Sequence, residues 1–420
     1  MIERHQEQAV VEALQDTPAV LLVGPRQVGK STLAHQLQPK MKAATIVSLD
    51  DAAVRNAAQA DPNGFIAGLE LPAVIDEVQR MPDLLYGIKD TVDRIRLSGD
   101  SADGSFLLTG SASIWDTLAA PESLAGRIER IPIAPFTQGE LTGRRERFID
   151  SLFDGHAPSL PKAGSDRLAI AEMVVRGGYP EVQDRGERRA QRWFSEYLSR
   201  VLDRDIRDLA NVRRPGEMLR LLTLCATRAG SIVNVDAMIG DLGIALSTGR
   251  RYYELLARVQ LIQEIPAWGA NLARATVRRP KLVLCDSGLT AHLLGISAAK
   301  FANDLNMKPG PGNLFESFVT LELLRASAWC HEDVRAFHWR ERSGREVDLL
   351  LERRDGSVTA FEHKLGTSIS QEDFRHLAYL RDQLGERFAG GAVIYTGENT
   401  IPFGERLWAV PVSGLWASLR

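Results

Sequence analysis

The segment from residue 24 to residue 32 holds the residue types with the clearest chemical meaning in this chain. It reads Gly24-Pro25-Arg26-Gln27-Val28-Gly29-Lys30-Ser31-Thr32 and fits the pattern G-x-x-x-x-G-K-[ST]. Glycines let the amides of such a loop curl around a phosphate, the lysine bridges the β and γ phosphate oxygens, and the hydroxyl ligates Mg²⁺. We therefore expect these residues to bind ATP, with Lys30 on the phosphates and Ser31 on the metal.

Two acids at the end of a second apolar run complete this chemistry. Asp76 and Glu77 directly follow the run Ala73–Ile75. We expect Asp76 to hold Mg²⁺ through water and Glu77 to act as general base toward the attacking water. A pair of surface acids without a catalytic role is the alternative.

Polar residues farther along are candidates for contact with the γ-phosphate. The apolar run Phe106–Thr109 is followed by Ser111, so Thr109 and Ser111 are both candidates for a polar sensor, and the sequence does not choose between them. Arg127 follows a turn, and Arg130 comes three residues later. An arginine that reaches the γ-phosphate of a neighbouring subunit stabilises charge in the transition state. We take Arg127 as the candidate; the alternative is a surface salt bridge.

Short apolar runs that alternate with helical stretches must position these residues. Such runs suit strands buried on both faces, and their alternation with helices is typical of a parallel sheet. We therefore predict an α/β fold with a P-loop domain in residues 1–150. Its expected strands are Ala19–Val23, Thr45–Leu49, Ala73–Ile75, Phe106–Thr109 and Ile128–Pro132.

Composition limits the class of protein. With 420 residues, 44% of them hydrophobic and 25% charged, the chain should form two or three folded domains. The net charge of -3 excludes a uniformly basic nucleic-acid coat, so any DNA contact must use a local patch. Three cysteines without a Cys-x-x-Cys pair, a polar N-terminus and the lack of a long apolar run lead us to expect a cytoplasmic protein that does not enter membranes.

The middle of the chain reads as consecutive helices. We expect a helical lid in residues 166–215 and, in residues 216–285, a segment that resembles a winged helix. Ser247 is its expected N-cap, and Arg250, Arg251 and Tyr252 should project from a recognition-type helix. These features indicate DNA binding, with protein packing as the alternative. The expected basic wing consists of Arg274, Arg278, Arg279 and Lys281.

The motifs together resemble a widespread prokaryotic family of AAA+-like ATPases. They are Gly-Pro-Arg-Gln-Val-Gly-Lys-Ser, Val-Ile-Asp-Glu-Val-Gln, Leu-Thr-Gly-Ser, Ser-Leu-Ala-Gly-Arg and Gly177-Gly-Tyr-Pro-Glu181. Members of this family carry a C-terminal domain of unknown function with a restriction-endonuclease-like fold. Later matches extend the resemblance over essentially the whole chain: Lys281-Leu-Val-Leu-Cys-Asp286-Ser-Gly288, Asn313-Leu-Phe-Glu316, Arg345-Glu-Val-Asp348 and Phe361-Glu-His-Lys364.

The family also looks related to the STAND switch proteins, whose Gly-x-Pro motif lies against the adenine. Gly178-Tyr179-Pro180 fits this motif. The resemblance thus implies that Pro180 contacts ATP and that the helical segment is a nucleotide-sensing lid.

The last domain, residues 312–420, carries groups of the PD-(D/E)XK nuclease type. Asp348 lies on one expected strand, and Glu362 and Lys364 lie on the next, where the two-residue period places them on one face. Asp348 and Glu362 would bind metal, Lys364 would orient or deprotonate the water, and Glu316 would be a fourth polar group. The alternative is an inactive module that keeps the fold for DNA binding or packing.

The leading interpretation is an ATPase with ATP and Mg²⁺ as cofactors that acts on DNA, with branched DNA as one substrate. Its expected partners are DNA and further copies of the chain, for which a hexamer is one form. Two other functions remain open: a STAND-like nucleotide-gated switch with little turnover, and a metal-dependent nuclease that ATP regulates.

Overall fold

The computed structural model describes residues 2–42, 45–111, 124–156, 166–206, 214–269, 279–303 and 310–416. Contacts divide the chain into two compact units. The N-terminal unit consists of residues 3–134 with 258–260, and the C-terminal unit of residues 1–2, 135–257 and 261–420. We describe each unit by itself.

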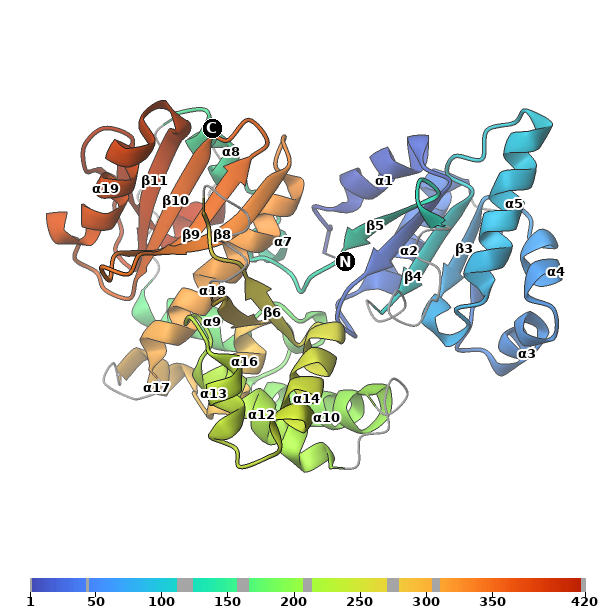
Figure 1. Cartoon of the computed structure of the whole chain (residues 1–420), viewed down its shortest axis with the longest axis horizontal. Coiled ribbons are helices and arrows are strands. Elements are labelled where there is room, and N and C mark those ends of the chain that lie inside the picture. Colours follow the sequence, from blue (N-terminus) through green and yellow to red (C-terminus); the bar gives the residue numbers. More distant parts are fainter. Residues whose placement is uncertain are drawn as a thin grey trace. The chain divides into compact units, whose positions relative to one another are not determined.

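The N-terminal unit is built on a five-stranded sheet in the order β2-β3-β4-β1-β5, in which every pair is parallel (Figure 1). This arrangement confirms the predicted parallel α/β fold. The strands are β1 (Ala19–Val23), β2 (Thr45–Ser48), β3 (Ala73–Asp76), β4 (Phe106–Gly110) and β5 (Ile128–Pro132). The helices are α1 (Glu7–Asp16), α2 (Lys30–Met41), α3 (Ala52–Ala60), α4 (Pro62–Ala67), the 3-10 turn η1 (Val78–Arg80) and α5 (Leu84–Ser98).

The three central strands are buried on both faces, which explains their uninterrupted apolar sequences. On one face, Leu21 and Ile75 belong to a core that includes Ile88 of α5. Parallel strands end at the same edge, and ligands of open α/β sheets bind outside that edge. The loop after β1, the acids after β3 and the polar end of β4 are therefore neighbours.

The C-terminal unit contains the helical middle of the chain. Its helices before the second sheet are α7 (Gln138–Thr142), α8 (Phe148–Phe153), α9 (Arg167–Arg176), the 3-10 turn η3 (Pro180–Val182), α10 (Glu187–Arg200), the π-helix η4 (Val201–Asp205), α12 (Pro215–Thr227), α13 (Val235–Gly240), α14 (Leu246–Arg258), α16 (Ser287–Leu294) and α17 (Ala298–Asn303). The sequence placed residues up to 150 with the ATPase core, but α7 and the start of α8 pack in this unit. Phe148 of α8 contacts Phe361 with 6.1 Å between ring centroids.

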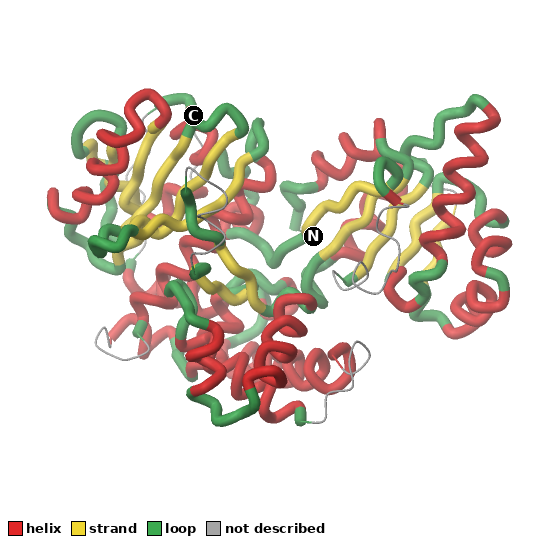
Figure 2. The backbone as a smooth tube through the Cα atoms, in the orientation of Figure 1, coloured by secondary structure: helices red, strands yellow, loops and turns green. Residues whose placement is uncertain are grey.

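A six-stranded mixed sheet forms the rest of this unit, in the order β12-β13-β11-β10-β9-β8. Its strands are β8 (Val334–Arg340), β9 (Glu346–Arg353), β10 (Val358–Lys364), β11 (Phe388–Tyr395), β12 (Ile401–Pro402) and β13 (Leu407–Pro411). Helix α18 (Pro311–Ala326) packs on one face and α19 (Arg375–Leu384) on the other. Short 3-10 turns complete it: η5 (Ser327–Trp329), η6 (Gln371–Phe374), η7 (Gly385–Arg387) and η8 (Val412–Trp416). Figure 2 shows its strands as one yellow layer.

A separate strand pair extends this sheet at its edge. Strands β6 (Ile262–Ile265) and β7 (Lys281–Leu284) pair antiparallel, and beyond β6 the chain continues alongside β8. The amide of Trp268 donates to the His338 carbonyl at 2.7 Å, and the His338 amide donates to the Pro266 carbonyl at 2.9 Å. The edge of β8 is thus hydrogen-bonded at this point to the segment that follows β6 and is not open to other strands.

A buried carboxylate, Asp286, holds the Gly177-Gly178 pair in the interior of this unit. Its Oδ2 accepts the Gly178 amide at 2.7 Å, its Oδ1 accepts the Leu289 amide at 3.0 Å, and Arg325 lies 3.5 Å away. A Cβ atom on Gly178 would lie 2.1 Å from the Phe136 carbonyl oxygen, so only glycine fits. This part of the family motif therefore has a structural role in the C-terminal unit.

We expect Asp286→Ala to lower the free energy of unfolding by about 3–5 kcal/mol, because it leaves two buried amides without their acceptor and removes the carboxylate that offsets the charge of Arg325 in the interior. Urea unfolding followed by near-UV circular dichroism measures the loss. Asp241→Ala, which removes an exposed carboxylate 3.7 Å from Arg228, is the matched control. Equal unfolding midpoints for the two variants would contradict this assignment.

Within the described residues, no helix has both the length and the apolar character that crossing a membrane requires.

Candidate functional site

The loop from Gly24 to Ser31 connects β1 to α2 in a conformation that depends on its glycines. Gly29 has φ 95° and Gln27 has φ 61°, both in the left-handed region. A Cβ on Gly24 would lie 2.1 Å from the Ile133 carbonyl oxygen. Helix α2 begins at Lys30, so its first amides point toward the loop. The result is a set of backbone donors suited to a phosphate.

Lys30 is folded beneath this loop. Its Nζ donates to the carbonyls of Gly24 at 2.9 Å and Pro25 at 2.8 Å. Burial lowers the pKa of Lys30 to about 8, against the opposing effect of Glu77 and Asp76. The ammonium group is thus poorly solvated, and within the described residues it bonds only to neutral carbonyls. An anionic phosphate would be a stronger acceptor for it.

Asp76 is the centre of a polar cluster at the ends of three strands and the P-loop. Its Oδ1 accepts from the Ser31 hydroxyl at 2.6 Å and from the Thr109 hydroxyl, and its Oδ2 accepts from the Ser48 hydroxyl at 3.4 Å. Ser31 and Asp76, the two predicted metal ligands, are therefore adjacent. A hydroxyl and a carboxylate oxygen are ligands that Mg²⁺ takes in nucleotide sites, so these residues fit the ion.

Glu77 follows in a constrained backbone, with φ 61°. Its amide donates to the Thr109 hydroxyl at 3.0 Å, and its carboxylate accepts from the side-chain amide of Gln79. Gln79 in turn accepts the Ser111 amide at 3.1 Å. Of the two candidate sensors, Thr109 donates its hydroxyl to the Asp76 carboxylate and accepts the Glu77 amide with the same oxygen. Ser111 donates its backbone amide to Gln79. Gln79 is a site residue that was not predicted, although its place two residues after Glu77 in the same motif is a usable signal.

Arg127 lies at the other end of the sheet from the P-loop of its own chain. Its carbonyl accepts the amide of Ala19, the first residue of β1, whereas the P-loop follows the last residue of that strand. Its Nε donates to Asp93 of α5 at 2.8 Å, and this bond lowers the pKa of Asp93. Arg130 lies on β5 opposite Leu21. Arg127 is therefore remote from the P-loop of its own chain.

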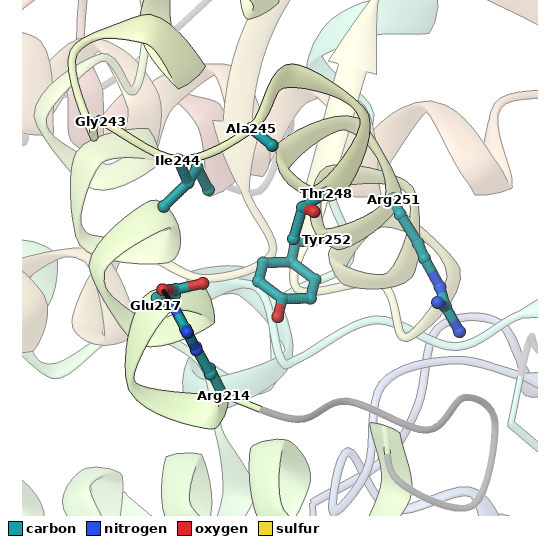
Figure 3. A pocket seen from close by; sticks show the side chains of 8 residues that line it. All are labelled: Arg214, Glu217, Gly243, Ile244, Ala245, Thr248, Arg251 and Tyr252. Atoms are coloured by element: carbon teal, nitrogen blue, oxygen red, sulfur yellow. Dashed lines mark hydrogen bonds and ion pairs between the residues drawn. The ribbon is translucent and has the colours of Figure 1, made fainter.

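The predicted recognition helix, α14, borders a cleft of about 580 Å³ in the C-terminal unit (Figure 3). Arg214 donates to Glu217 at 2.8 Å on one wall. Arg251 is exposed, and the described part of the chain offers its guanidinium no hydrogen-bond or ion-pair partner. The lining residues are Arg214, Glu217, Gly243, Ile244, Ala245, Thr248, Arg251 and Tyr252.

Other residues predicted on this helix differ from expectation. Arg250 is engaged with Asp236 of α13 through bonds of 2.8 and 2.6 Å. Tyr252 does not project into solvent: it is only 5% exposed, and its ring lies in the cleft toward Arg214 and Glu217 (Figure 3). Helix α14 begins at Leu246, so Ser247 lies inside the first turn and is not the N-cap.

Of the predicted wing, Arg274 and Arg278 lie outside the described residues. Arg279 is exposed, and its carbonyl accepts from His338 Nε2 at 3.1 Å. Lys281 was expected as an exposed basic residue, and this was wrong: it is 4% exposed. Its Nζ donates to Glu316 Oε1 at 2.6 Å, to Asp348 Oδ1 at 2.9 Å and to the Asp348 carbonyl at 3.2 Å. Lys281 can be buried because the carboxylates of Glu316 and Asp348 pair with its charge.

The four predicted nuclease groups do not form one open site. Glu316 and Asp348 line a cavity of about 180 Å³ together with Lys281. Glu362 and Lys364 line another, of about 220 Å³, and the Lys364 ammonium is paired with Asp373 of η6. Within the described residues there is no group of three or more Asp, Glu, His or Cys side chains placed to hold a metal ion.

Glu362 is nevertheless close to the first pair. Burial and the neighbouring Asp348 carboxylate raise its pKa well above the ordinary value. Glu362 thus lies beside Asp348, although it lines the other cavity.

Pro180, predicted to contact ATP, begins η3 and is half-buried. It belongs to the C-terminal unit, whereas the P-loop belongs to the N-terminal unit.

Comparison with known proteins agrees with this geometry. Residues 16–142 match the model of an AAA domain. Residues 167–300 and 311–415 match two domains of unknown function, DUF8612 and DUF4143. The N-terminal unit, with its parallel sheet, P-loop and paired acids, is therefore a P-loop ATPase domain of the AAA type, and the expected C-terminal domain of unknown function is confirmed.

Two mycobacterial proteins are similar over almost the whole chain. They are the uncharacterized proteins Mb2031c of Mycobacterium bovis and Rv2008c of Mycobacterium tuberculosis. Each is 31% identical over 415 residues, which cover 98% of this chain and 84% of the relative. This chain belongs to the same family as these proteins. Among solved structures, the Walker-type ATPase PABY2304 of Pyrococcus abyssi aligns over 70% of this chain and 96% of its own, with a TM-score of 0.40 and 15% identity.

Proposed function

We propose that this chain is a Mg²⁺-dependent ATPase that couples ATP binding and hydrolysis to DNA binding or remodelling. The observation that carries the first part is that the Ser31 and Thr109 hydroxyls both donate to Asp76 Oδ1. Glu77 and the buried Lys30 lie beside this carboxylate. These side chains come from the P-loop and two strand ends, and together they supply a phosphate ligand, metal ligands and a base.

The roles follow from the positions. The loop amides and Lys30 hold the phosphates, because Lys30 can exchange its two neutral carbonyl partners for anionic oxygens. Ser31 and Asp76 hold Mg²⁺, which when bound offsets charge on the β and γ phosphates. Thr109 orients Asp76 and the backbone of Glu77. Glu77 then takes the proton of the attacking water.

Arg127 supports assembly into a homo-oligomer. Because it lies at the amino end of β5, it can act only on the nucleotide of a neighbouring copy, after exchanging Asp93 for a phosphate. A hexameric ring is one arrangement that repeats such a contact. Native mass measured with and without ATP tests this part of the proposal.

The DNA part rests on α13, α14 and the β6–β7 pair, which follow each other in the order of a winged helix. Gly249 lets α14 approach α13 closely, since a Cβ there would lie 2.2 Å from Ile239. In this proposal residues 166–215 form a lid that carries Pro180, and residues 216–285 bind the phosphate backbone through Arg251.

Arg251→Ala is expected to weaken duplex DNA binding roughly fivefold to tenfold at 0.1 M salt. The slope of the logarithm of the binding constant against the logarithm of the salt concentration should become shallower by about one. Arg250→Ala is the matched comparison on the same helix. It should have a smaller effect, because Asp236 already engages that guanidinium. Fluorescence anisotropy at several salt concentrations measures both. The assignment fails if the two variants lose the same affinity.

The decisive experiment measures ATP turnover with single-stranded, duplex and branched DNA. We expect at least one of these to raise turnover severalfold, and Arg251→Ala to reduce that increase. Unchanged turnover with every DNA would instead favour a nucleotide-gated switch. One observation favours the switch as the second candidate: Gln79 holds the Glu77 carboxylate, which would restrain the base.

A further inference from the structure

We infer that Lys281 takes the place of a divalent cation among the buried acids of the C-terminal unit, and that this cluster joins the middle segment to the C-terminal sheet. The inference goes beyond the proposed ATPase, because it concerns neither ATP nor the helix α14. It assigns a structural role to residues whose pattern suggested a metal-dependent nuclease.

The bonds of Lys281 leave no opening for a metal. An ammonium group has three donors, and the Lys281 Nζ has three acceptors: Glu316 Oε1 at 2.6 Å, Asp348 Oδ1 at 2.9 Å and the Asp348 carbonyl at 3.2 Å. The other oxygen of Asp348 accepts the His363 amide at 2.9 Å. A divalent ion at Asp348 would use the same oxygens and would repel the ammonium at this distance.

Within the described residues, neither of the two remaining nuclease groups is bonded to Lys281. The Lys364 ammonium is paired with Asp373. Glu362 lies beside Asp348, and its buried Oε1 is 3.5 Å from His376 without a hydrogen bond. Both line the second cavity and not the one that holds Lys281. The lysine next to the Asp348 carboxylate is thus supplied from β7, 67 positions earlier in the chain.

The surrounding backbone shows what the cluster joins. Lys281 is the first residue of β7, and two residues before it the Arg279 carbonyl accepts from His338 of β8. The segment after β6 bonds to His338 on both its amide and its carbonyl. The strand pair is therefore tied to the C-terminal sheet by backbone bonds, and Lys281 adds charged bonds to β9 and α18.

The test compares full-length wild type with Lys281→Met, Glu362→Gln and the control Lys300→Met, all without nucleotide. Lys300 is an exposed lysine whose Nζ donates to the Gly295 carbonyl. Thermal unfolding is recorded in EDTA and in millimolar MnCl₂, and bound Mn²⁺ is counted by electron paramagnetic resonance. Any Mn²⁺ at the P-loop is common to all four proteins.

We expect Lys281→Met to melt about 10 °C below wild type in EDTA, because Asp348 loses its buried partner. Mn²⁺ should raise the melting temperature of this variant alone, by several degrees. Wild type and Glu362→Gln should bind equal amounts of Mn²⁺, which remains measurable if Lys281→Met does not fold. A Mn²⁺ ion that wild type binds and Glu362→Gln loses would overturn the inference. It would also be overturned if Lys281→Met melted at the same temperature as Lys300→Met, or if Mn²⁺ did not change the melting temperature of Lys281→Met.

Discussion

Lys30→Ala is expected to weaken ATP binding on the order of 100-fold to 1,000-fold, because it removes a buried cation from the phosphate site. In the structure Lys30 is 7% exposed, and among the residues that are described its ammonium bonds only to two loop carbonyls. The triphosphate would supply charged acceptors in their place. The loop amides remain in the variant, so residual binding should persist at high ATP concentration.

Isothermal titration with ATP and Mg²⁺ measures this effect, with circular dichroism as the check on folding. Lys40→Ala is the matched control: it removes a lysine of the same helix whose exposed side chain is paired with Glu7. Affinity should be unchanged in that variant. Retention of normal ATP affinity by folded Lys30→Ala would remove the basis of the proposed site.

The nucleotide site was predictable from the sequence because its parts are local. The three central strands are short apolar runs, and the functional residues lie at or just beyond their ends, as Asp76 is the last residue of β3. A P-loop needs only that a strand precede it and a helix follow. These conditions involve neighbours along the chain, so they can be read without knowledge of the tertiary structure.

Strands of the C-terminal sheet were harder to predict. Strand β13, Leu407–Pro411, is five buried residues with no alternation, and such a run cannot be distinguished by period from other apolar segments. Strand β12 has only two residues. The last strand that the sequence predicts is Ala392–Tyr395, and both β12 and β13 lie beyond it. The sequence therefore indicates a smaller sheet than the one that forms.

The partners of charged side chains could not be predicted, because they depend on contacts between distant segments. Lys281 belongs to a run of basic residues and was expected on an exposed wing, but it is bonded to Asp348. Lys364 fits the nuclease pattern in its spacing, but its ammonium is paired with Asp373. Spacing along a strand predicts the face on which a side chain lies and not the partner that it contacts.

The hydrogen-bond partners of the candidate base, Glu77, could not be predicted from the sequence either. The position of Glu77 after β3 identifies it as a candidate base, whereas its bond to Gln79 and its amide bond to Thr109 are known only from the structure. The bond from Gln79 holds the Glu77 carboxylate, and the bond to Thr109 holds the Glu77 backbone. Neither an amide side chain nor a hydroxyl is a strong proton acceptor, so we expect Glu77 to be the base.

Glu77→Gln is expected to lower kcat for ATP hydrolysis by about 100-fold to 10,000-fold while ATP affinity changes little, since an amide keeps the shape of the side chain but cannot accept the proton. Single-turnover hydrolysis and ATP titration on the same preparation separate the two effects. Asp83→Asn, an exposed acid just before α5, is the matched control and should hydrolyse ATP normally. If Glu77→Gln lost affinity and rate together, Glu77 would serve the fold or the metal and another group would be the base.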